Sequence, residues 1–222
     1  MRYEVKVVLD NSELAEVFQW LKKDTLAKEK YDKRKVHSLY LDDIFYSSVK
    51  DNLAGISDRK KIRLRWYGED EEKFKPSFEI KFREGRLGFK EVHRIPSLDG
   101  NFIDRPINSI IRECNKELIS QNIVLDNYLI PSLQTTYERE YYEDNEGVRF
   151  TLDKNINFYK PLLLGKLNTT LPTPYPLQVL EVKFPSDLKN KVNKLISSLN
   201  LRPRRHSKYL IGLSSLGLAT YI

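Results

Sequence analysis

The nine residues RKKIRLRWY, residues 59–67, decide the fold of this chain. A β-strand places successive side chains on opposite faces, so an alternation of cations with apolar residues predicts a strand with one charged and one apolar face. One face would carry Arg59, Lys61, Arg63 and Arg65, and the other Lys60, Ile62, Leu64 and Trp66.

The same alternation of charged with apolar side chains recurs in four more stretches of the sequence. In a fifth stretch, Arg139 shares one face with Tyr137 and Tyr141. The charged sets of the four stretches are Arg2, Glu4 and Lys6; Glu79, Lys81 and Arg83; Arg149, Thr151 and Asp153; and Glu181 with Lys183.

A solvated face of an antiparallel sheet would explain any one of these strands. However, such a face usually mixes Thr, Ser and Gln with its charges, whereas this face is mostly Arg and Lys in strand after strand. Like charges on neighbouring strands destabilise a sheet, so the pattern calls for an anionic ligand. The sequence therefore predicts an α+β fold with a closed antiparallel β-barrel, a charged lumen and helices packed on the outside.

Helical periodicity is visible in five segments, at residues 12–23, 43–53, 106–120, 186–199 and, more weakly, 208–216. Residues 68–76 and 163–176 are rich in turn-forming residues and are predicted to be loops. No linker or repeat divides the sequence, which favours one domain over residues 1–222.

The composition excludes several classes of protein. The chain has 222 residues, a net charge of +7 and a single cysteine, Cys114, so a disulfide framework and a CxxC zinc site are excluded. The most apolar stretch, residues 209–222, is too short for a membrane span, and the N-terminus lacks an apolar signal region. We therefore expect a cytoplasmic protein with an anionic partner.

The charged face has the chemistry of a phosphate site. Arg grips phosphate oxygens with a planar fork, and Lys supplies a point charge. Glu4 and Glu181 could hold Mn²⁺ or Mg²⁺ among bound phosphates, or each could simply pair with a neighbouring cation. Loss of Arg63 or Arg65 would relieve repulsion among like charges in a charged tunnel, whereas lower stability without ligand would count against the tunnel and indicate a salt-bridged face in contact with solvent.

An ordered series of motifs resembles the VTC domain, the catalytic domain of the vacuolar transporter chaperone polyphosphate polymerase. This domain belongs to the triphosphate tunnel metalloenzyme, or CYTH-like, superfamily. The resemblance covers nearly the whole chain. It rests on VHSLYLD (36–42), DNLAG (51–55), RKKIRLRWY (59–67), FEIK (78–81), YER (137–139), VRFTLD (148–153), LEVK (180–183) and SKY (207–209).

The resemblance implies transfer of the γ-phosphoryl group of ATP to a growing inorganic polyphosphate chain inside a basic tunnel. It implies that Glu181 binds Mn²⁺ or Mg²⁺, beside which Glu4 is the second candidate ligand from the charge pattern, and that Tyr137 stacks on the base. Lys81, Arg139 and Lys208 would be the catalytic residues. The substrate would be bound by Lys6, Arg63, Arg65, Lys81, Tyr137, Arg139, Arg149, Lys183, Arg205, Ser207 and Lys208, although Ser207 could equally cap the last helix.

One position departs from the hydrolytic tunnel enzymes, which share an N-terminal E-x-E-x-K. Here the strand reads RYEVK (2–6), so Arg2 replaces the first carboxylate, which favours the polymerase. A tripolyphosphate or nucleoside triphosphate hydrolase and a non-catalytic polyphosphate-binding module remain alternatives, and a membrane-protein partner is compatible with the family. Nucleic acid is not expected, because few aromatic residues accompany the cations. His37, His93 and His206 lack metal-ligand spacing.

Overall fold

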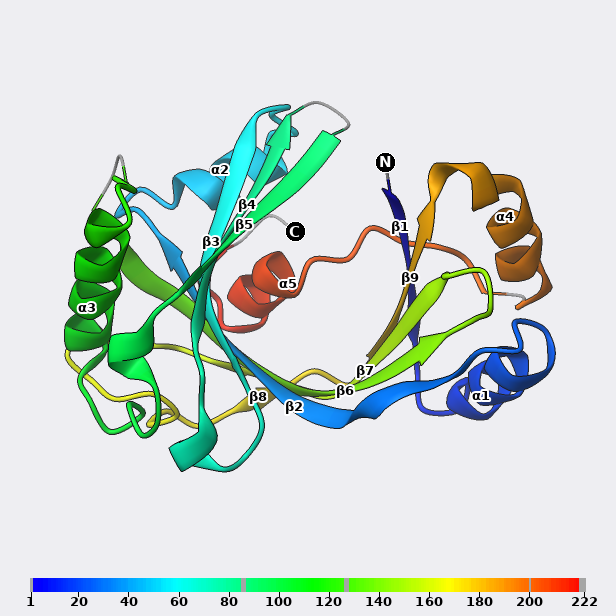
Figure 1. Ribbon diagram of the computed structural model, residues 1–222, viewed down its shortest axis with the longest axis horizontal. Coiled ribbons are helices and arrows are strands. Elements are labelled where there is room, and N and C mark those ends of the chain that lie inside the picture. Colours follow the sequence, from blue (N-terminus) through cyan, green and yellow to red (C-terminus); the bar gives the residue numbers. More distant parts are fainter. Residues whose placement is uncertain (1, 85–86, 126–127, 200, 220–222) are drawn as a thin grey trace. The chain divides into compact units, whose positions relative to one another are not determined.

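The computed structural model describes residues 2–84, 87–125, 128–199 and 201–219 (Figure 1). The strands are β1 (Arg2–Leu9), β2 (Lys28–Asp42), β3 (Arg59–Tyr67), β4 (Ser77–Glu84), β5 (Leu87–Arg94), β6 (Ile130–Glu143), β7 (Arg149–Tyr159), β8 (Thr173–Pro174) and β9 (Gln178–Pro185). The helices are α1 (Leu14–Lys23), α2 (Ser47–Leu53), α3 (Ile107–Ser120), α4 (Lys189–Ser198) and α5 (Lys208–Ser215). Short 3-10 helices lie at η1 (Glu71–Lys73), η2 (Pro96–Leu98) and η3 (Ser186–Leu188).

The strands form a sheet in the order β1-β9-β7-β6-β2-β3-β4-β5, with β8 paired to β7. The pairs β1–β9, β7–β9, β2–β3, β3–β4 and β4–β5 are antiparallel. The α+β class with an antiparallel sheet is thus confirmed. The order begins at β1 and ends at β5, so closure of the sheet into a barrel stays a prediction.

The chain divides into two compact units. Unit 1 comprises residues 1–34, 137–156 and 174–207, and unit 2 comprises residues 35–136, 157–173 and 208–222. Strands β2, β6 and β7 contribute residues to both. The single domain over residues 1–222 stays a prediction, and the two units are described separately.

In unit 1, α1 and α4 cover the apolar face of β1, β7 and β9 (Figure 1). The core combines Val17 and Trp20 of α1 with strand residues such as Phe150 and Val182, all buried. The indole Nε1 of Trp20 donates to the carbonyl of Leu195 on α4 at 2.9 Å, which joins the two helices. Because α1 and α4 pack on the apolar face, they do not cover the opposite, charged face of these strands.

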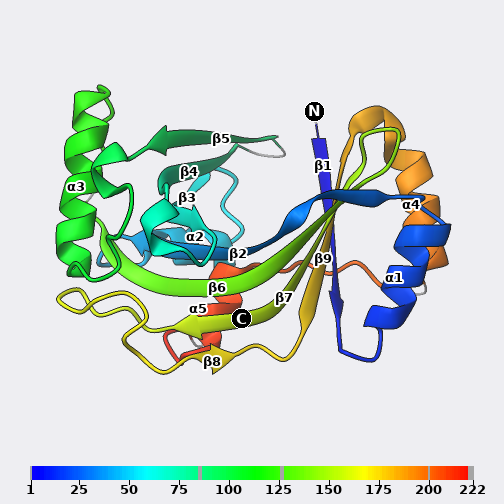
Figure 2. The ribbon, with the colours of Figure 1, turned by 60° about the horizontal axis from the view of Figure 1, so that its bottom comes forward.

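In unit 2, α3 covers the apolar face of β2, β3 and β4, and β5 lies beside β4 (Figure 2). The predicted stripe of α3, including Ile107, Ile111 and Cys114, belongs to the same buried core cluster as Ile62 and Leu64 of β3. In both units, therefore, helices cover the apolar faces of the strands, as the alternation predicted.

Helix α5 corrects the expectation that all helices pack on the outside. Tyr40 of β2 lies directly opposite Arg63 of β3 and so shares its charged face. The ring of Tyr209 on α5 stacks on Tyr40, with centroids 4.8 Å apart. Helix α5 therefore packs on the charged face of unit 2, where its Tyr209 stacks on Tyr40.

The second predicted helix begins later than residue 43. Asp42 Oδ1 accepts from the amides of Asp43 and Ser48, and Asp43 Oδ1 accepts from those of Phe45 and Ser47, so this segment forms a side-chain-capped turn. The other predicted helices match the structure to within a few residues. No helix in the described part of the chain is long and apolar enough to cross a membrane.

Candidate functional site

The charged face of unit 2 contains a buried carboxylate among cations. We name Arg63, Arg65, Glu79 and Lys90 the Glu79 cluster. Arg63 lies directly opposite Glu79 across β3 and β4, and its Nε and Nη2 reach Glu79 Oε2 at 2.7 and 2.6 Å. Lys90 Nζ of β5 lies 3.0 Å from Glu79 Oε1, and Arg65 Nη1 lies 3.8 Å from Oε2. Three cations from two strands therefore converge on one carboxylate.

Glu79 is only 3% exposed, yet it is held in its charged form. Burial opposes ionisation, but Arg63 and Arg65, assisted by Lys90, outweigh it and lower the pKa of Glu79 to about 2. At neutral pH the cluster thus combines three cations with one permanent anion and carries a net positive charge.

The two arginines of the cluster have further anchors on β2. Arg63 Nη1 donates to the hydroxyl of Tyr40 at 3.3 Å, and its guanidinium lies 5.8 Å from the centre of the Tyr40 ring. Arg65 Nε donates to Ser38 Oγ at 3.2 Å. Both guanidinium groups are therefore fixed before any ligand binds.

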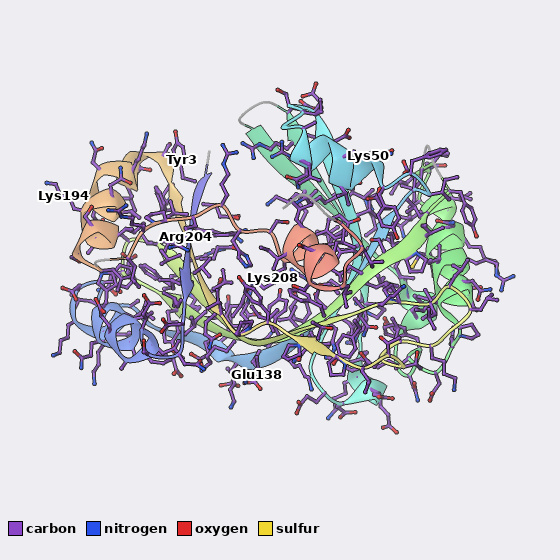
Figure 3. The ribbon with its side chains drawn as sticks, turned by 180° about the vertical axis from the view of Figure 1, so that it is seen from behind. Tyr3, Lys50, Glu138, Lys194, Arg204 and Lys208 are labelled. Carbon is purple, nitrogen blue, oxygen red and sulfur yellow. The ribbon has the colours of Figure 1, made fainter. Side chains whose placement is uncertain are left out.

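Tyr40 connects the cluster to α5. Although burial opposes ionisation, Arg63, Arg65 and Lys208 lower the pKa of Tyr40. Its stacking partner Tyr209 donates to Asp42 Oδ2 at 2.7 Å, and Lys208 is the first residue of α5 (Figure 3). The predicted residue Lys208 therefore begins the helix that stacks on Tyr40, and Tyr40 contacts Arg63 of the Glu79 cluster.

A row of lysines crosses the same face. Lys81 of β4, a predicted catalytic residue, lies directly opposite Lys61 of β3 on one side and Lys90 of β5 on the other. The next row pairs Arg59 with Arg83. Directly opposed like charges are unfavourable in a sheet, so these rows favour an anion on this face.

The charged face of unit 1 contains a second buried carboxylate. We name Glu4, Lys6, Glu181 and Lys183 the Glu181 cluster. On paired strands β1 and β9, Lys6 lies opposite Glu181 and Glu4 lies opposite Lys183. Lys6 Nζ is 2.9 Å from Glu4 Oε1 and 3.6 Å from Glu181 Oε2, and Lys183 Nζ is 2.5 Å from Glu181 Oε1. Charges of opposite sign therefore alternate across the two strands.

Glu181 is 7% exposed and carries the negative charge at the centre of this cluster. Burial disfavours that charge, but Lys183, then Lys6 and Arg139, lower the pKa of Glu181 well below its usual range. Glu4 is more exposed and also contacts Lys6 and Lys183.

Arg139 and Tyr137 lie on β6 in the same unit. Arg139 makes a two-pronged contact with the fully buried Asp153 of β7, with Nε–Oδ1 and Nη2–Oδ2 distances of 2.5 and 2.7 Å. Its guanidinium also lies 5.3 Å from the centre of the Tyr137 ring. Tyr137 is 2% exposed, so the ring proposed to stack on a base is covered by Arg139 in this structure.

The remaining predicted residues lie nearer the surface of unit 1. Arg149 of β7 is opposite Lys183 and contacts Glu143 at 3.3 Å. Arg205 is exposed, and Ser207 is half-buried in the segment before α5. The same segment runs beside β1, where the amide of Arg204 donates to the carbonyl of Lys6 at 2.8 Å (Figure 3).

The Glu181 cluster fits a divalent cation that binds together with phosphate. Glu4 and Glu181 both contact Lys6 and Lys183, so their carboxylate oxygens lie on one patch of the face. No group of three or more His, Cys, Asp or Glu side chains suited to a metal ion occurs among the residues that the structure describes. Mg²⁺ and similar hard cations accept one or two carboxylates when phosphate oxygens complete the shell.

Sequence reasoning missed Lys90, and with it the whole of β5. In LGFKEVHR (87–94) the alternation is obscured because Glu91 stands among the apolar positions and Val92 among the charged ones. It also left Tyr40 and Asp153 without a role. In the sequence, Tyr40 is distinguished only by its position between two leucines and two residues before Asp42. That position does not reveal a functional role unless the strand register is known.

Two solved structures share the fold of this chain. HpAC1 from Hippeastrum, described as an adenylyl cyclase candidate with a dominant triphosphatase activity, has a TM-score of 0.57 and is 16% identical, over 96% of each chain. An adenylate cyclase candidate from Vibrio parahaemolyticus has a TM-score of 0.53 and is 13% identical, over 96% of this chain and 97% of its own. At such identities these neighbours show the fold alone.

The sequence identifies the family. The VTC domain matches residues 1–217, and the chain belongs to the VTC domain family. Subunit 2 of the vacuolar transporter chaperone complex of Saccharomyces cerevisiae is 22% identical over 84% of this chain. The match covers 29% of the length of that yeast subunit, so this chain corresponds to one part of it.

Proposed function

We propose that this protein is a polyphosphate polymerase that uses ATP and Mn²⁺ or Mg²⁺. In the proposed reaction, the bond between the γ-phosphorus of ATP and the oxygen bridging to the β-phosphate breaks. A terminal oxygen of the polyphosphate chain forms the new bond to that phosphorus, and ADP leaves with the bridging oxygen. Such a transfer depends on positioning and charge neutralisation more than on covalent chemistry from the protein.

The observation that carries the proposal is the charged face of each unit, where cations are held by a buried carboxylate. Arg63, Arg65 and Lys90 surround Glu79, and Lys6 and Lys183 flank Glu181. Preorganised cations stabilise the charge that develops on a transferring phosphoryl group without reorganising during the reaction. Membership of the VTC domain family supports the choice of a phosphate chain as substrate.

The proposed roles follow the predicted residues. Lys81, Arg139 and Lys208 would stabilise the transferring group. The substrate phosphates would be held by Lys6, Arg63, Arg65, Arg149, Lys183, Arg205 and Ser207. Tyr137 would contact the base only after Arg139 moves off its ring, since the two are in contact now.

Glu181 and Glu4 would hold the divalent cation. When bound, that cation neutralises phosphate oxygens and orients them for the transfer. Lys6 and Lys183 already contact both carboxylates, so they would turn towards the phosphates as the cation arrives.

The test is an incubation of the purified protein with ATP and Mn²⁺, resolved on a polyphosphate gel beside an assay for free phosphate. The wild type should give long chains with release of ADP. Glu181→Gln should reduce chain synthesis by roughly 100-fold or more, as expected for the loss of one group that stabilises developing charge. A fully active Glu181→Gln would contradict the metal role.

The matched control is Glu138→Gln. Glu138 neighbours Arg139 on β6, and strand alternation places it on the opposite face (Figure 3). This variant should retain the activity of the wild type, which separates loss of the site from loss of a carboxylate in general.

Hydrolysis is the second candidate, because a structural neighbour is described as having a dominant triphosphatase activity. Free phosphate without chains would favour it. Binding of polyphosphate without either product would favour a binding module. In all three cases we propose a cytoplasmic site of action, with a membrane protein as a partner, since the yeast relative is a subunit of a vacuolar transporter chaperone complex.

A further inference from the structure

Glu79 occupies the donor atoms that a phosphate on this face would use. Its Oε2 contacts both Nε and Nη2 of Arg63, and its Oε1 accepts a hydrogen bond from Nζ of Lys90. Guanidinium forks and ammonium groups bind carboxylate and phosphate oxygens through the same charge-assisted contacts. A phosphate that binds here must therefore compete with the carboxylate of Glu79.

We propose that Glu79 is an exchangeable internal counter-ion that limits how tightly phosphate chains bind to unit 2. A substrate phosphate takes over the donors of Arg63 and Lys90, and Glu79 takes them back when that phosphate moves on. This inference rests on the proposed function, because it assumes that the charged face of unit 2 binds phosphates.

A chain polymerase needs such a limit on affinity. Its product must advance after each transfer, so each binding position must be favourable enough to enter and weak enough to leave. Without Glu79, the three cations Arg63, Arg65 and Lys90 would meet the polyanion without the carboxylate that they contact now. The chain would then bind tightly and move slowly.

The arginines remain anchored when Glu79 is neutral. Arg63 keeps its contact with the Tyr40 hydroxyl, and Arg65 keeps its contact with Ser38. Loss of the charge at Glu79 should therefore leave the donors in place and strengthen phosphate binding. If Glu79 served only to position the arginines, the same change would weaken binding, so the two roles predict opposite signs.

The experiment measures the affinity of the full chain for tripolyphosphate by calorimetry without ATP, for the wild type, Glu79→Gln and the control Glu84→Gln. Glu84 is an exposed carboxylate at the end of the same strand. Glu79→Gln should bind roughly tenfold more tightly, the lower bound for one charge-assisted contact, and Glu84→Gln should bind like the wild type. Affinity equal to or below that of the wild type in Glu79→Gln overturns the proposal.

Tyr40→Phe in the Glu79→Gln background tests the anchor. Loss of the hydroxyl should remove most of the gain in affinity, whereas an undiminished gain would contradict the role given to Tyr40. If Glu79→Gln fails to fold, Glu79→Asp replaces it. The shorter side chain withdraws the carboxylate from Arg63 and should tighten binding roughly threefold, since part of the contact is lost. Unchanged or weaker binding by Glu79→Asp overturns the proposal.

The outcomes separate this inference from the proposed function. If Glu79→Gln binds more tightly but the protein makes no polyphosphate, the role of Glu79 as a counter-ion is supported and the proposed polymerase activity is contradicted. If the wild type makes polyphosphate but Glu79→Gln binds no more tightly, the proposed function is supported and the role of Glu79 as a counter-ion is contradicted. A wild type without affinity for tripolyphosphate overturns both.

Discussion

Buried carboxylates form ion pairs with cations of the charged faces. Glu79, Glu181 and Asp153 are each less than a tenth exposed, and each contacts at least one Arg or Lys. Removing one partner from a buried pair leaves an uncompensated charge and is strongly destabilising. The contacts of Arg63 and Arg65 with Glu79 therefore indicate salt bridges, and the simple repulsion considered from the sequence does not describe these two residues.

The lowered pKa of Glu79 predicts how stability depends on pH. Burial opposes the charge, but Arg63, Arg65 and Lys90 hold the pKa at about 2 instead of 4.5. As the pH falls, Glu79 therefore becomes protonated in the unfolded chain before it does so in the folded protein. The contribution of Glu79 to the free energy of unfolding is complete above about pH 4.5 and is lost as the pH falls towards 2. That contribution is about 3 kcal/mol.

Urea unfolding of the wild type and Glu79→Gln at pH 6 and pH 3 measures this contribution. The wild type should be the more stable at pH 6, and its advantage should shrink by about 2 kcal/mol at pH 3, because most of the window between the two pKa values has then been crossed. Glu84→Gln controls for removal of a carboxylate from the same strand. An advantage that is constant between the two pH values would show that Glu79 is not held in its charged form by the cluster.

At the scale of the element, α5 requires a glycine. A Cβ built on Gly212 would lie 2.6 Å from Leu133 Cδ2 and 2.7 Å from Phe158 Cδ1. Both of those side chains are fully buried, Leu133 on β6 and Phe158 on β7, so neither can move without disturbing the core of unit 2. The close approach brings Tyr209 of α5 onto Tyr40.

Gly212→Ala should therefore destabilise the protein. Overpacking in a buried position costs roughly 1–3 kcal/mol, of which the better helix propensity of alanine returns about 1 kcal/mol. Chemical denaturation measures the net loss, with Ser214→Ala on the exposed side of α5 as the matched control. Unchanged or increased stability of Gly212→Ala would mean that α5 packs less closely than the structure shows.

The secondary-structure elements that were predicted well from the sequence are those in which apolar residues recur at a regular spacing. Strand β3 was predicted at its observed bounds, because cations and apolar residues alternate from Lys61 to Trp66. Strand β5 was missed because Glu91 and Val92 break its alternation. The place of α5 could not be predicted, since the contact of Tyr209 with Tyr40 joins residues far apart in the sequence.

The candidate site was predictable in its residue types and less so in its pairings. Arg63, Arg65, Lys6, Glu181 and Lys183 were all singled out from the alternation and the family resemblance, and they do lie in charged clusters. Which carboxylate meets which cation depends on strand register. No local pattern in the sequence gives the order β1-β9-β7-β6-β2-β3-β4-β5.

For the whole molecule, the excess of cations predicts stabilisation by polyanions. The chain has 38 Lys and Arg against 31 Asp and Glu, a net charge of +7. Tripolyphosphate at roughly 100 times its dissociation constant should raise the free energy of unfolding by about 2.7 kcal/mol, or Tm by roughly 5–10 °C. The effect should shrink at high salt, because screening weakens contacts between exposed charges.

Thermal unfolding with and without tripolyphosphate, at low and high sodium chloride, measures this effect. Sodium chloride at the same ionic strength as the tripolyphosphate is the control for screening alone. A rise in Tm that does not depend on salt would contradict an electrostatic site on the charged faces.

The segment that follows α4 also protects a strand edge. Pro203 forms a bridge with Val7, and the amide of Arg204 donates to the carbonyl of Lys6, so part of the outer side of β1 is covered by the chain itself. Uncovered strand edges recruit strands of other molecules and lead to aggregation, and a proline beside an edge offers no amide for such recruitment. The same few residues that place Arg205 and Ser207 in unit 1 thus also help to keep copies of the protein apart at high concentration.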